Sequence, residues 1–146
     1  MTIHKLENNE KPAALDLVWE VFMQFEAPEY IQEGIDTFKD FINDKNSTDS
    51  LLMYGAFENN EIIGVIAMRC GKSHITLFFV KDKYQKQGVG RKLFNTVLKK
   101  CDSDYMTVNS SPYAVDFYHN LGFKDESPEQ LADGIRFTPM ILKLSK

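Results

Sequence analysis

Apolar residues in the first half of the chain recur at two periods, which predict helices followed by strands. Leu15, Val18 and Phe22 lie three or four residues apart and form one face of a helix. Further along, two apolar runs flank the turn-forming pair Asn59-Asn60, a pattern typical of antiparallel strands. In chain order we expect a strand at residues 2–6, helices at 12–25 and 31–42, a polar loop at 43–50, and strands at 51–57 and 62–68.

The second half of the chain predicts a strand, a helix, a strand and a further helix. Residues 75–80 are β-branched or aromatic almost throughout, which indicates a central strand buried on both faces. Residues 89–101 carry apolar side chains at helical spacing, so a helix follows after a short loop. The next strand ends at Asn109, and Ser110-Ser111-Pro112 then starts a helix that Gly122 ends.

The composition is that of a globular domain. With 146 residues, 43% hydrophobic and 12% aromatic, the chain fits a single domain that spans residues 1–146. The N-terminus has no apolar signal core and no apolar run approaches membrane-spanning length, so we expect a cytoplasmic protein with no membrane partner. The two cysteines lack the spacing of a disulfide framework or a zinc site, and we expect no metal.

Basic residues are concentrated in one segment of an otherwise acidic chain. The net charge of −4 argues against nucleic acid as a partner, whereas residues 81–100 contain seven basic side chains and one acid. Lys86, Arg91 and Lys92 lie in the loop or first turn of the helix after the central strand, where positive charge opposes the helix dipole. This placement favours a bound polyanion, and the ordinary alternative is a solvated helix face.

Two glycines, Gly88 and Gly90, lie where the central strand gives way to the helix. Unpaired N–H groups at a helix start bind anions, and glycine lets a ligand approach the backbone closely. The segment lacks the Walker phosphate-loop pattern and the third glycine of the dinucleotide-binding pattern. Gly71-Lys72-Ser73 lacks the first Walker glycine and is interpreted as a hairpin turn. We therefore expect a phosphate site of another type at the two glycines.

Two motifs in this half of the chain resemble the GCN5-related N-acetyltransferase (GNAT) superfamily. Gln85-x-x-Gly88-x-Gly90 is similar to the loop that binds the acyl-CoA pyrophosphate in that family. The second motif follows one helix and one strand later and is similar to the family's other diagnostic segment. It reads Asn109-Ser110-Ser111-Pro112-Tyr113-Ala114-Val115-x-Phe117-Tyr118-x-x-Leu121-Gly122-Phe123. The resemblance covers nearly the whole chain and is closest over residues 75–123.

The resemblance implies a fold. It is a small single-domain α/β (α+β) acetyltransferase fold of bacterial type, with a mixed central sheet of about six to seven strands, splayed central strands and about four flanking helices. Residues 134–140 resemble the last, long strand of some small members. Pro139 in that strand then has to lie at an edge or a bulge, because it has no N–H for a ladder bond.

The resemblance also implies a function and a binding site. The expected activity is transfer of an acetyl group from acetyl-CoA directly to a primary amine of a small molecule or peptide. The exposed backbone groups of Phe78, Phe79 and Val80 would pair with the pantetheine arm together with Asn109. Backbone N–H groups of the glycine loop, residues 87–92, would bind the pyrophosphate. The cofactor-binding residues expected on this basis are Phe78, Phe79, Val80, Gln85, Lys86, Gln87, Gly88, Val89, Gly90, Arg91, Lys92 and Asn109.

Three residues are candidates for proton transfer. Tyr118 matches the family tyrosine that reprotonates the CoA thiolate, so the resemblance assigns it the role of general acid. The general base remains open. It is His74 at the start of the central strand, an imidazole expected to titrate near neutrality, or Glu26 in the break between the first two helices, or a chain of water molecules. His119 is expected to face solvent and to take no part.

The acceptor and the function class are left open at this point. Glu26, Glu29, Glu33 and Asp36 either attract a cationic amine or form an ordinary solvated face. The alternatives to catalysis are an acyl-CoA-binding sensor without turnover and a regulator that binds nucleotide phosphates. Both a monomer and a homodimer are compatible with the sequence.

Overall fold

The structure is a computed structural model that describes residues 1–69 and 73–144. Cys70 and most of the hairpin turn expected at Gly71-Lys72-Ser73 lie outside the described residues. The described helices are α1 (Lys11–Val21), α2 (Gln32–Asn43), α3 (Lys45–Asp49), α4 (Val89–Lys100) and α5 (Val115–Asn120). The strands are β1 (Thr2–Lys5), β2 (Leu52–Glu58), β3 (Glu61–Met68), β4 (His74–Val80), β5 (Tyr105–Ser110), β6 (Lys124–Asp125), β7 (Gln130–Ala132) and β8 (Ile135–Lys143). No helix among these is long and apolar enough to cross a membrane.

The eight described strands form one mixed sheet. Its order is β1-β2-β3-β4-β5-β8-β6, and β7 pairs with β8. Neighbouring strands run antiparallel except β4 and β5, which are parallel. The α/β class and the mixed sheet expected from the sequence are therefore confirmed. The sheet exceeds the expected size because β6 and β7, of two and three residues, are too short to show a period in the sequence.

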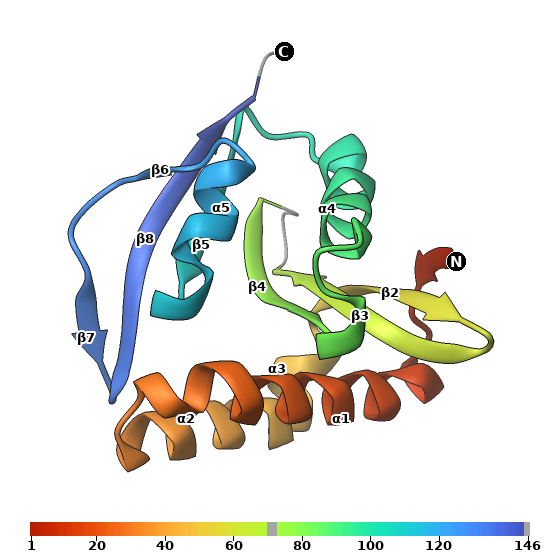
Figure 1. The fold of residues 1–146 in the computed structure, drawn as a ribbon, viewed down its shortest axis with the longest axis horizontal. Coiled ribbons are helices and arrows are strands. Elements are labelled where there is room, and N and C mark those ends of the chain that lie inside the picture. The colour runs from red at the N-terminus through yellow and green to blue at the C-terminus, as the bar shows by residue number, and fades with distance from the viewer. Residues whose placement is uncertain (70–72, 145–146) are drawn as a thin grey trace.

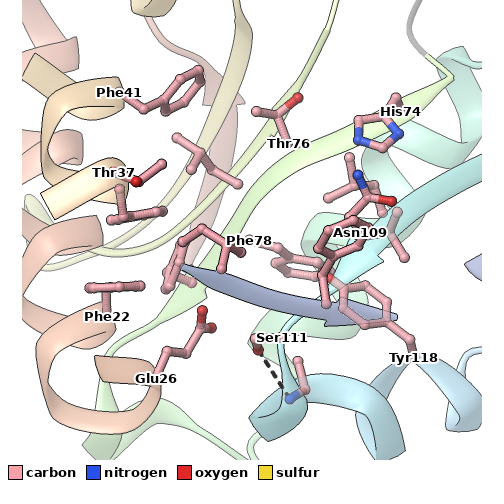
Figure 2. Close-up of a pocket in the computed structure, with 18 of the residues that line it drawn as sticks. Phe22, Glu26, Thr37, Phe41, His74, Thr76, Phe78, Asn109, Ser111 and Tyr118 are labelled. Carbon is pink, nitrogen blue, oxygen red and sulfur yellow. Dashed lines mark hydrogen bonds between the residues drawn. The ribbon is translucent and has the colours of Figure 1, made fainter. Parts of the chain in front are cut away.

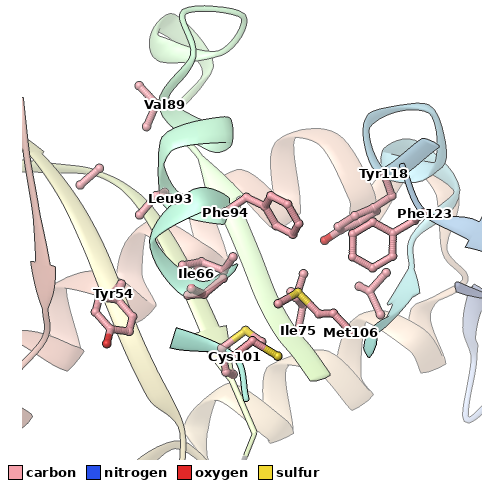
Figure 3. Close-up of a cluster of buried hydrophobic side chains, with 14 of the residues drawn as sticks. Tyr54, Ile66, Ile75, Val89, Leu93, Phe94, Cys101, Met106, Tyr118 and Phe123 are labelled. Atoms are coloured by element: carbon pink, nitrogen blue, oxygen red, sulfur yellow. The ribbon is translucent and has the colours of Figure 1, made fainter. Parts of the chain in front are cut away.

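Helices cover both faces of the sheet, and each face has its own apolar core (Figure 1). On one face α1, which has its proline in the first turn as expected, packs Val18 into a cluster with Phe79. On the other face α4 buries Leu93 and Phe94 against Ile66, as Figure 3 shows. Burial of each such side chain contributes about 1.5 to 3 kcal/mol, so the two cores fix the sheet between its helices.

One extra residue interrupts the register between β3 and β4. Ala67 pairs with Leu77, whereas Met68 pairs with Ile75, so Thr76 has no partner on β3. A bulge of this kind changes the face to which the following side chains point. Ile75 accordingly joins the α4 core, and Leu77 joins the α1 core.

Strands β4 and β5 separate soon after they meet. Within the described residues they pair only at His74–Thr107 and Ile75–Val108. The expectation of splayed central strands is confirmed. The expectation that β4 is buried on both faces is wrong, because alternate residues from Thr76 onward are only half-buried where the sheet opens.

The hairpin of β7 and β8 folds back onto α2. Its turn, Asp133-Gly134, has positive φ at both residues, 52° and 79°. Gly134 lies so close to Gly34 of α2 that a Cβ on either glycine would clash with the backbone of the other segment. Thr37 Oγ1 also donates to the Asp133 carbonyl oxygen at 2.7 Å. The turn is therefore docked on the helix mainly through the backbone.

Pro139 lies within β8, opposite Asn109 of β5. Its carbonyl oxygen accepts from the Glu126 N–H at 2.8 Å, on the side away from β5. In a strand, the N–H and C=O groups of one residue face the same side. The nitrogen of Pro139 therefore also faces away from β5. It lies between the residues of β8 that pair with β6 and those that pair with β7. The proline therefore takes a local edge position, as expected.

The polar loop expected at residues 43–50 is partly wrong, because α3 forms within it. Asp44 caps this helix and accepts from the Asn46 N–H at 3.3 Å and from Ser47 Oγ at 2.7 Å. At the other end, the buried Lys11 Nζ donates to three carbonyl oxygens, at 3.2 or 3.3 Å. Polar side chains at both ends thus hold a helix that has no apolar period to reveal it.

Candidate functional site

Two cavities lie beside the opening between β4 and β5. The first has a volume of about 380 Å³ and is bounded by residues of α2, β4, β5 and β8 (Figure 2). The second, of about 400 Å³, is bounded by β4, the glycine loop and the segment before α5. Glu26, Phe78, Phe79 and Ala114 line both cavities. The two cavities therefore adjoin at these residues.

The glycine loop forms one wall of the second cavity. Gly88 has φ of 84° and precedes α4, so the helix starts at Val89 as expected. The N–H groups of Val89, Gly90 and Arg91 occupy the first three helical positions, which have no intrahelical acceptor. The Lys92 N–H, by contrast, donates to the Gly88 carbonyl at 3.0 Å. The expectation that the Lys92 backbone binds phosphate is therefore wrong, while its side chain is exposed and still positioned beside the loop.

Hydrogen bonds from two glutamines hold the loop in shape. Gln85 Nε2 donates to the Val80 carbonyl at 2.9 Å, and Gln85 Oε1 accepts from the Tyr113 hydroxyl at 3.0 Å. Gln87 Nε2 donates to the Lys83 carbonyl at 2.8 Å. Gln85 thus joins the end of β4 to the segment before α5, across the second cavity that it lines.

Positive charge surrounds the loop. Of the seven basic residues expected there, Lys81 pairs with Glu61 at 2.7 Å. The other six are exposed, and none of them forms an ion pair with a described carboxylate. Lys83, Lys86, Arg91 and Lys92 lie in or next to the loop and the first turn of α4, whereas Lys99 and Lys100 lie in its last turn. A cavity with helical N–H donors and unpaired cations at its rim suits a polyanion.

The backbone of β4 presents hydrogen-bonding groups to the opening. Lys81 N–H donates to the Ile63 carbonyl at 2.9 Å, which sets the alternation along the strand. The N–H and C=O groups of Phe78 and Val80 consequently face away from β3, toward the gap. The backbone of Phe79 faces β3, where it pairs with Val65. The expected set of three open backbone positions is therefore corrected to two, although the Phe79 side chain lines both cavities.

Glu26 lies where the two cavities adjoin. It ends a π-helical turn (Phe22–Glu26) that follows α1, and a 3₁₀ turn (Ala27–Glu29) comes directly after it. Burial raises the pKa of its carboxyl to about 7, and a hydrogen bond from Ser111 acts in the opposite direction. Figure 2 shows the carboxyl group directed toward the cavity and toward Ser111. A carboxyl that titrates near neutrality is suited to proton transfer.

Tyr118 is buried at the wall of the first cavity. Its ring packs edge-on against Phe78, Phe117 and Phe123, with centroids 6.2, 5.5 and 5.5 Å away. Burial, and secondly the charge of Glu26, raise the pKa of its hydroxyl. The phenol thus stays protonated at every physiological pH and is positioned as a hydrogen-bond or proton donor.

His74 differs from its sequence-based expectation. Its Nδ1 lies 2.8 Å from Thr107 Oγ1, and burial lowers its pKa to about 4, with a smaller contribution from the charge of Arg69. The expected titration near neutrality is therefore wrong. The imidazole lines the first cavity only, as does Asn109, which is exposed. His119 is exposed, as expected, and lies 2.8 Å from Asp125, and it lines neither cavity.

The acidic cluster expected near the helix break does not converge on the site. Glu29 pairs with Arg136 at 3.7 Å, and Asp36 accepts from Gln32 at 2.9 Å. Glu26 is the one carboxylate among the described residues that line the cavities. Within the described residues no group of His, Cys, Asp or Glu is arranged to hold a metal ion.

Sequence analysis missed several residues that line the cavities. Arg69, Thr76 and Phe137 line the first cavity, and Tyr113 and Phe117 line the second. Tyr113 and Phe117 lie inside the second motif, so their place in that motif could have indicated them. Thr76 gives no signal, because a bulge inside an apolar strand has no marker in the sequence, and Phe137 is brought in only by the docking of the β7–β8 hairpin.

Comparisons with known proteins agree with this geometry. A family model described as an acetyltransferase (GNAT) domain matches residues 26–144. A search among curated proteins found no match.

Solved structures of the same fold align over nearly the whole chain. A GCN5-related N-acetyltransferase from Rhodopseudomonas palustris has a TM-score of 0.85 at 18% identity, covering 98% of this chain and 95% of that one. A GNAT-family acetyltransferase from Staphylococcus aureus Mu50 has a TM-score of 0.76 at 18% identity, with 99% of each chain covered. PaiA N-acetyltransferase from Thermoplasma acidophilum, in complex with coenzyme A, has a TM-score of 0.67 at 21% identity, with 98% and 99% covered.

The raised pKa of Glu26 generates a prediction about stability. Its carboxyl titrates near 4.5 when unfolded and near 7 when folded, so the native state binds more protons between these values and loses stability as pH rises through them. Glu26→Gln should therefore unfold like the wild type at pH 4 but be more stable by about 1 to 3 kcal/mol at pH 8. Urea unfolding at both pH values measures this. Glu33→Gln, on the exposed face of α2, should give no gain, and equal gains in both variants would contradict the assignment.

Proposed function

The chain belongs to the GNAT acetyltransferase family, and from that membership we propose that it transfers an acetyl group from acetyl-CoA directly to a primary amine. The observation that carries the proposal is the pair of cavities that adjoin at Glu26 beside the gap between β4 and β5. One cavity has the features of a polyanion site. The other adjoins it at Glu26 and is proposed as the site of the acceptor.

Acetyl-CoA is the proposed occupant of the second cavity. Its pyrophosphate would accept hydrogen bonds from the N–H groups of Val89, Gly90 and Arg91, in the field of the exposed lysines. Its pantetheine arm would pair with the open backbone groups of Phe78 and Val80, as an added strand does. The carbonyl of Val80 is held by Gln85 in this structure, so Gln85 has to release it when the arm binds. The related PaiA structure is a complex with coenzyme A, which supports coenzyme A as a ligand of this chain.

The proposed reaction is a direct displacement that combines one acyl transfer with two proton transfers. The amine nitrogen attacks the thioester carbonyl carbon, the new C–N bond forms and the C–S bond breaks. The attacking nitrogen loses one proton to the Glu26 carboxylate, and the departing thiolate gains one from the Tyr118 hydroxyl. Water then returns the proton from Glu26 to Tyr118 through the adjoining cavities. Holding the two reactants in line supplies much of the acceleration, on the order of 7 to 11 kcal/mol.

Glu26 is proposed as the base in preference to His74. A base with a pKa of about 7 is half deprotonated at neutral pH and still binds a proton well, whereas one of about 4 is a weak acceptor. The positions agree with this choice, because Glu26 lines both cavities and His74 lines only the first. Phe78 and Val80 supply the open N–H groups near the same point, where one of them would stabilise the developing oxyanion.

Acetyl-CoA binding is tested first. Coenzyme A at one hundred times its dissociation constant should stabilise the wild type by about 2.7 kcal/mol. Gly90→Asp should abolish this shift and keep the fold, because its carboxylate enters the anion site while its Cβ comes within 3.2 Å of the mobile end of the half-exposed Phe117 ring. Asn95→Asp adds the same charge on the exposed face of α4 and should retain the shift. Equal shifts in all three proteins would place the phosphates elsewhere.

The role of Glu26 in proton transfer is tested by the pH dependence of turnover. In the wild type, kcat/KM for a fixed amine should rise with pH through an apparent pKa of about 7, since the base acts in its deprotonated form. Glu26→Gln should lose this limb and fall by roughly 10²-fold at pH 8. Thiol release at saturating acetyl-CoA provides the measurement. A His74→Gln variant should keep the limb, and its loss there instead would transfer the role to His74.

Replacement of Tyr118 separates the enzyme from a sensor that binds acyl-CoA without turnover. Tyr118→Phe removes the hydroxyl but keeps the ring packing, so turnover should fall by about 10²-fold while coenzyme A affinity changes little. Tyr105→Phe, at an exposed position on β5, serves as the control and should retain full turnover. Unchanged turnover in Tyr118→Phe would remove the proposed acid, and a large loss of affinity would move Tyr118 into the cofactor site.

A further inference from the structure

The far end of the first cavity carries polar groups that the proposed reaction does not use. Arg69, His74 and Thr76 line this end of the cavity, whereas Asn109 lines it nearer to Glu26, two residues before Ser111. Figure 2 shows His74 and Thr76 around the upper part of the cavity, Glu26 at the opposite side, and Asn109 between them. The cavity thus has two chemically different ends.

Arg69 is the cation of this polar end. It follows β3, and its N–H donates to the His74 carbonyl at 3.1 Å, so the two residues lie opposite each other on adjacent strands. No carboxylate in the described part of the chain forms an ion pair with its guanidinium. Its charge nevertheless reaches the cavity, since it lowers the pKa of His74. An unpaired guanidinium at a cavity wall is a natural partner for a carboxylate.

Thr76 supplies a second unused group. Its Oγ1 is buried and has no hydrogen-bond partner among the described residues. A buried hydroxyl without a partner costs about 1 to 3 kcal/mol, so such groups usually have a ligand or water to bond. The bulge at Thr76 turns this residue toward the first cavity, which it lines.

The region between the two ends is apolar. Phe22, Phe38, Phe41 and Phe137 line it, and Phe22 stacks on Phe38 with centroids 3.9 Å apart. The only described carboxylate in the cavity is Glu26. A polyamine or other polycation would find one carboxylate, a facing arginine and aromatic walls, which is a poor match for several positive charges.

We infer that the acceptor is an amphipathic amino-carboxylate, whose amine lies at Glu26, whose carboxylate binds Arg69 and Thr76, and whose apolar body packs on the phenylalanines. This inference rests on the proposed function, because it takes the first cavity as the acceptor site. Thr76, at the carboxylate end, and Phe79, beside Glu26, are three residues apart along β4, a path of about 10 Å. The amine and the carboxylate therefore belong to opposite ends of the molecule, farther apart than in an α-amino acid.

Two probe amines test the inference with the full chain saturated with coenzyme A. 4-(3-Aminopropyl)benzoate has the ring, the amine and a distant carboxylate, and 3-phenylpropylamine is the same molecule without the carboxylate. Calorimetry should show the benzoate binding about tenfold tighter to the wild type, the scale of one charge-assisted hydrogen-bonded pair. Arg69→Met keeps the stem without the charge and should remove this preference. Lys143→Met, which removes a charge at the exposed end of β8, should preserve it.

A second variant gives a readout that a purely structural role would not move. Thr76→Val keeps the shape and removes the unpaired hydroxyl, so it should leave the melting temperature unchanged or raise it while weakening the benzoate about threefold. A lowered melting temperature with unchanged benzoate affinity would assign Thr76 to the fold alone.

The outcomes separate this inference from the proposed function. If coenzyme A fails to stabilise the protein, the proposed function itself is refuted, and the assignment of the acceptor site falls with it. If coenzyme A binds but the two amines bind equally, or neither binds, only the inference is overturned. The same holds if Arg69→Met keeps the tenfold preference.

Discussion

The pairing of β4 with β5 ends after two residue pairs, and the site depends on that interruption. A backbone group left without a partner inside a protein is costly, so an opening in the middle of a sheet requires something to occupy it. Here the N–H and C=O groups of Phe78 and Val80 face the gap, and both cavities lie beside it. The extra residue at Thr76 contributes to the same opening, because it redirects β4 while the strand still pairs with β3.

Burial of polar groups at this opening sets the chemistry. Desolvation raises the pKa of the Glu26 carboxyl to about 7, and the same effect keeps the Tyr118 phenol protonated. Both conditions weaken the folded state, since charges and hydroxyl groups prefer water. The two apolar cores, built on α1 and on α4, supply the stability that lets the centre of the sheet remain polar and open. The strands stay apart beyond their two residue pairs, and contacts from side chains such as Gln85 and Phe78 bridge the opening.

The sequence predicted the parts of the molecule that have a short-range signature. The helix start at Gly88, the strand at β4 and the serine-capped segment before α5 each follow from a few neighbouring residues. Features set by distant contacts were not accessible in this way. The pKa of His74 depends on its burial against β5 and on Arg69, and the orientation of the Phe79 backbone depends on the register with β3. The capped helix α3 was missed because its stability comes from Asp44 and Lys11 and not from an apolar period.

The contact between Gly34 and Gly134 has a consequence for how this fold can diversify. The β7–β8 hairpin meets α2 at Gly34 mainly through its backbone, whereas Ile135 and Phe137 line the first cavity. The backbone of the hairpin thus makes the close contact with α2, and two of its side chains form part of the cavity wall. Side chains on the cavity wall can be exchanged over generations while the hairpin stays in place, provided that the two glycines are kept. In this fold the two glycines have to be conserved, whereas the hairpin side chains that line the cavity can change to suit a new acceptor.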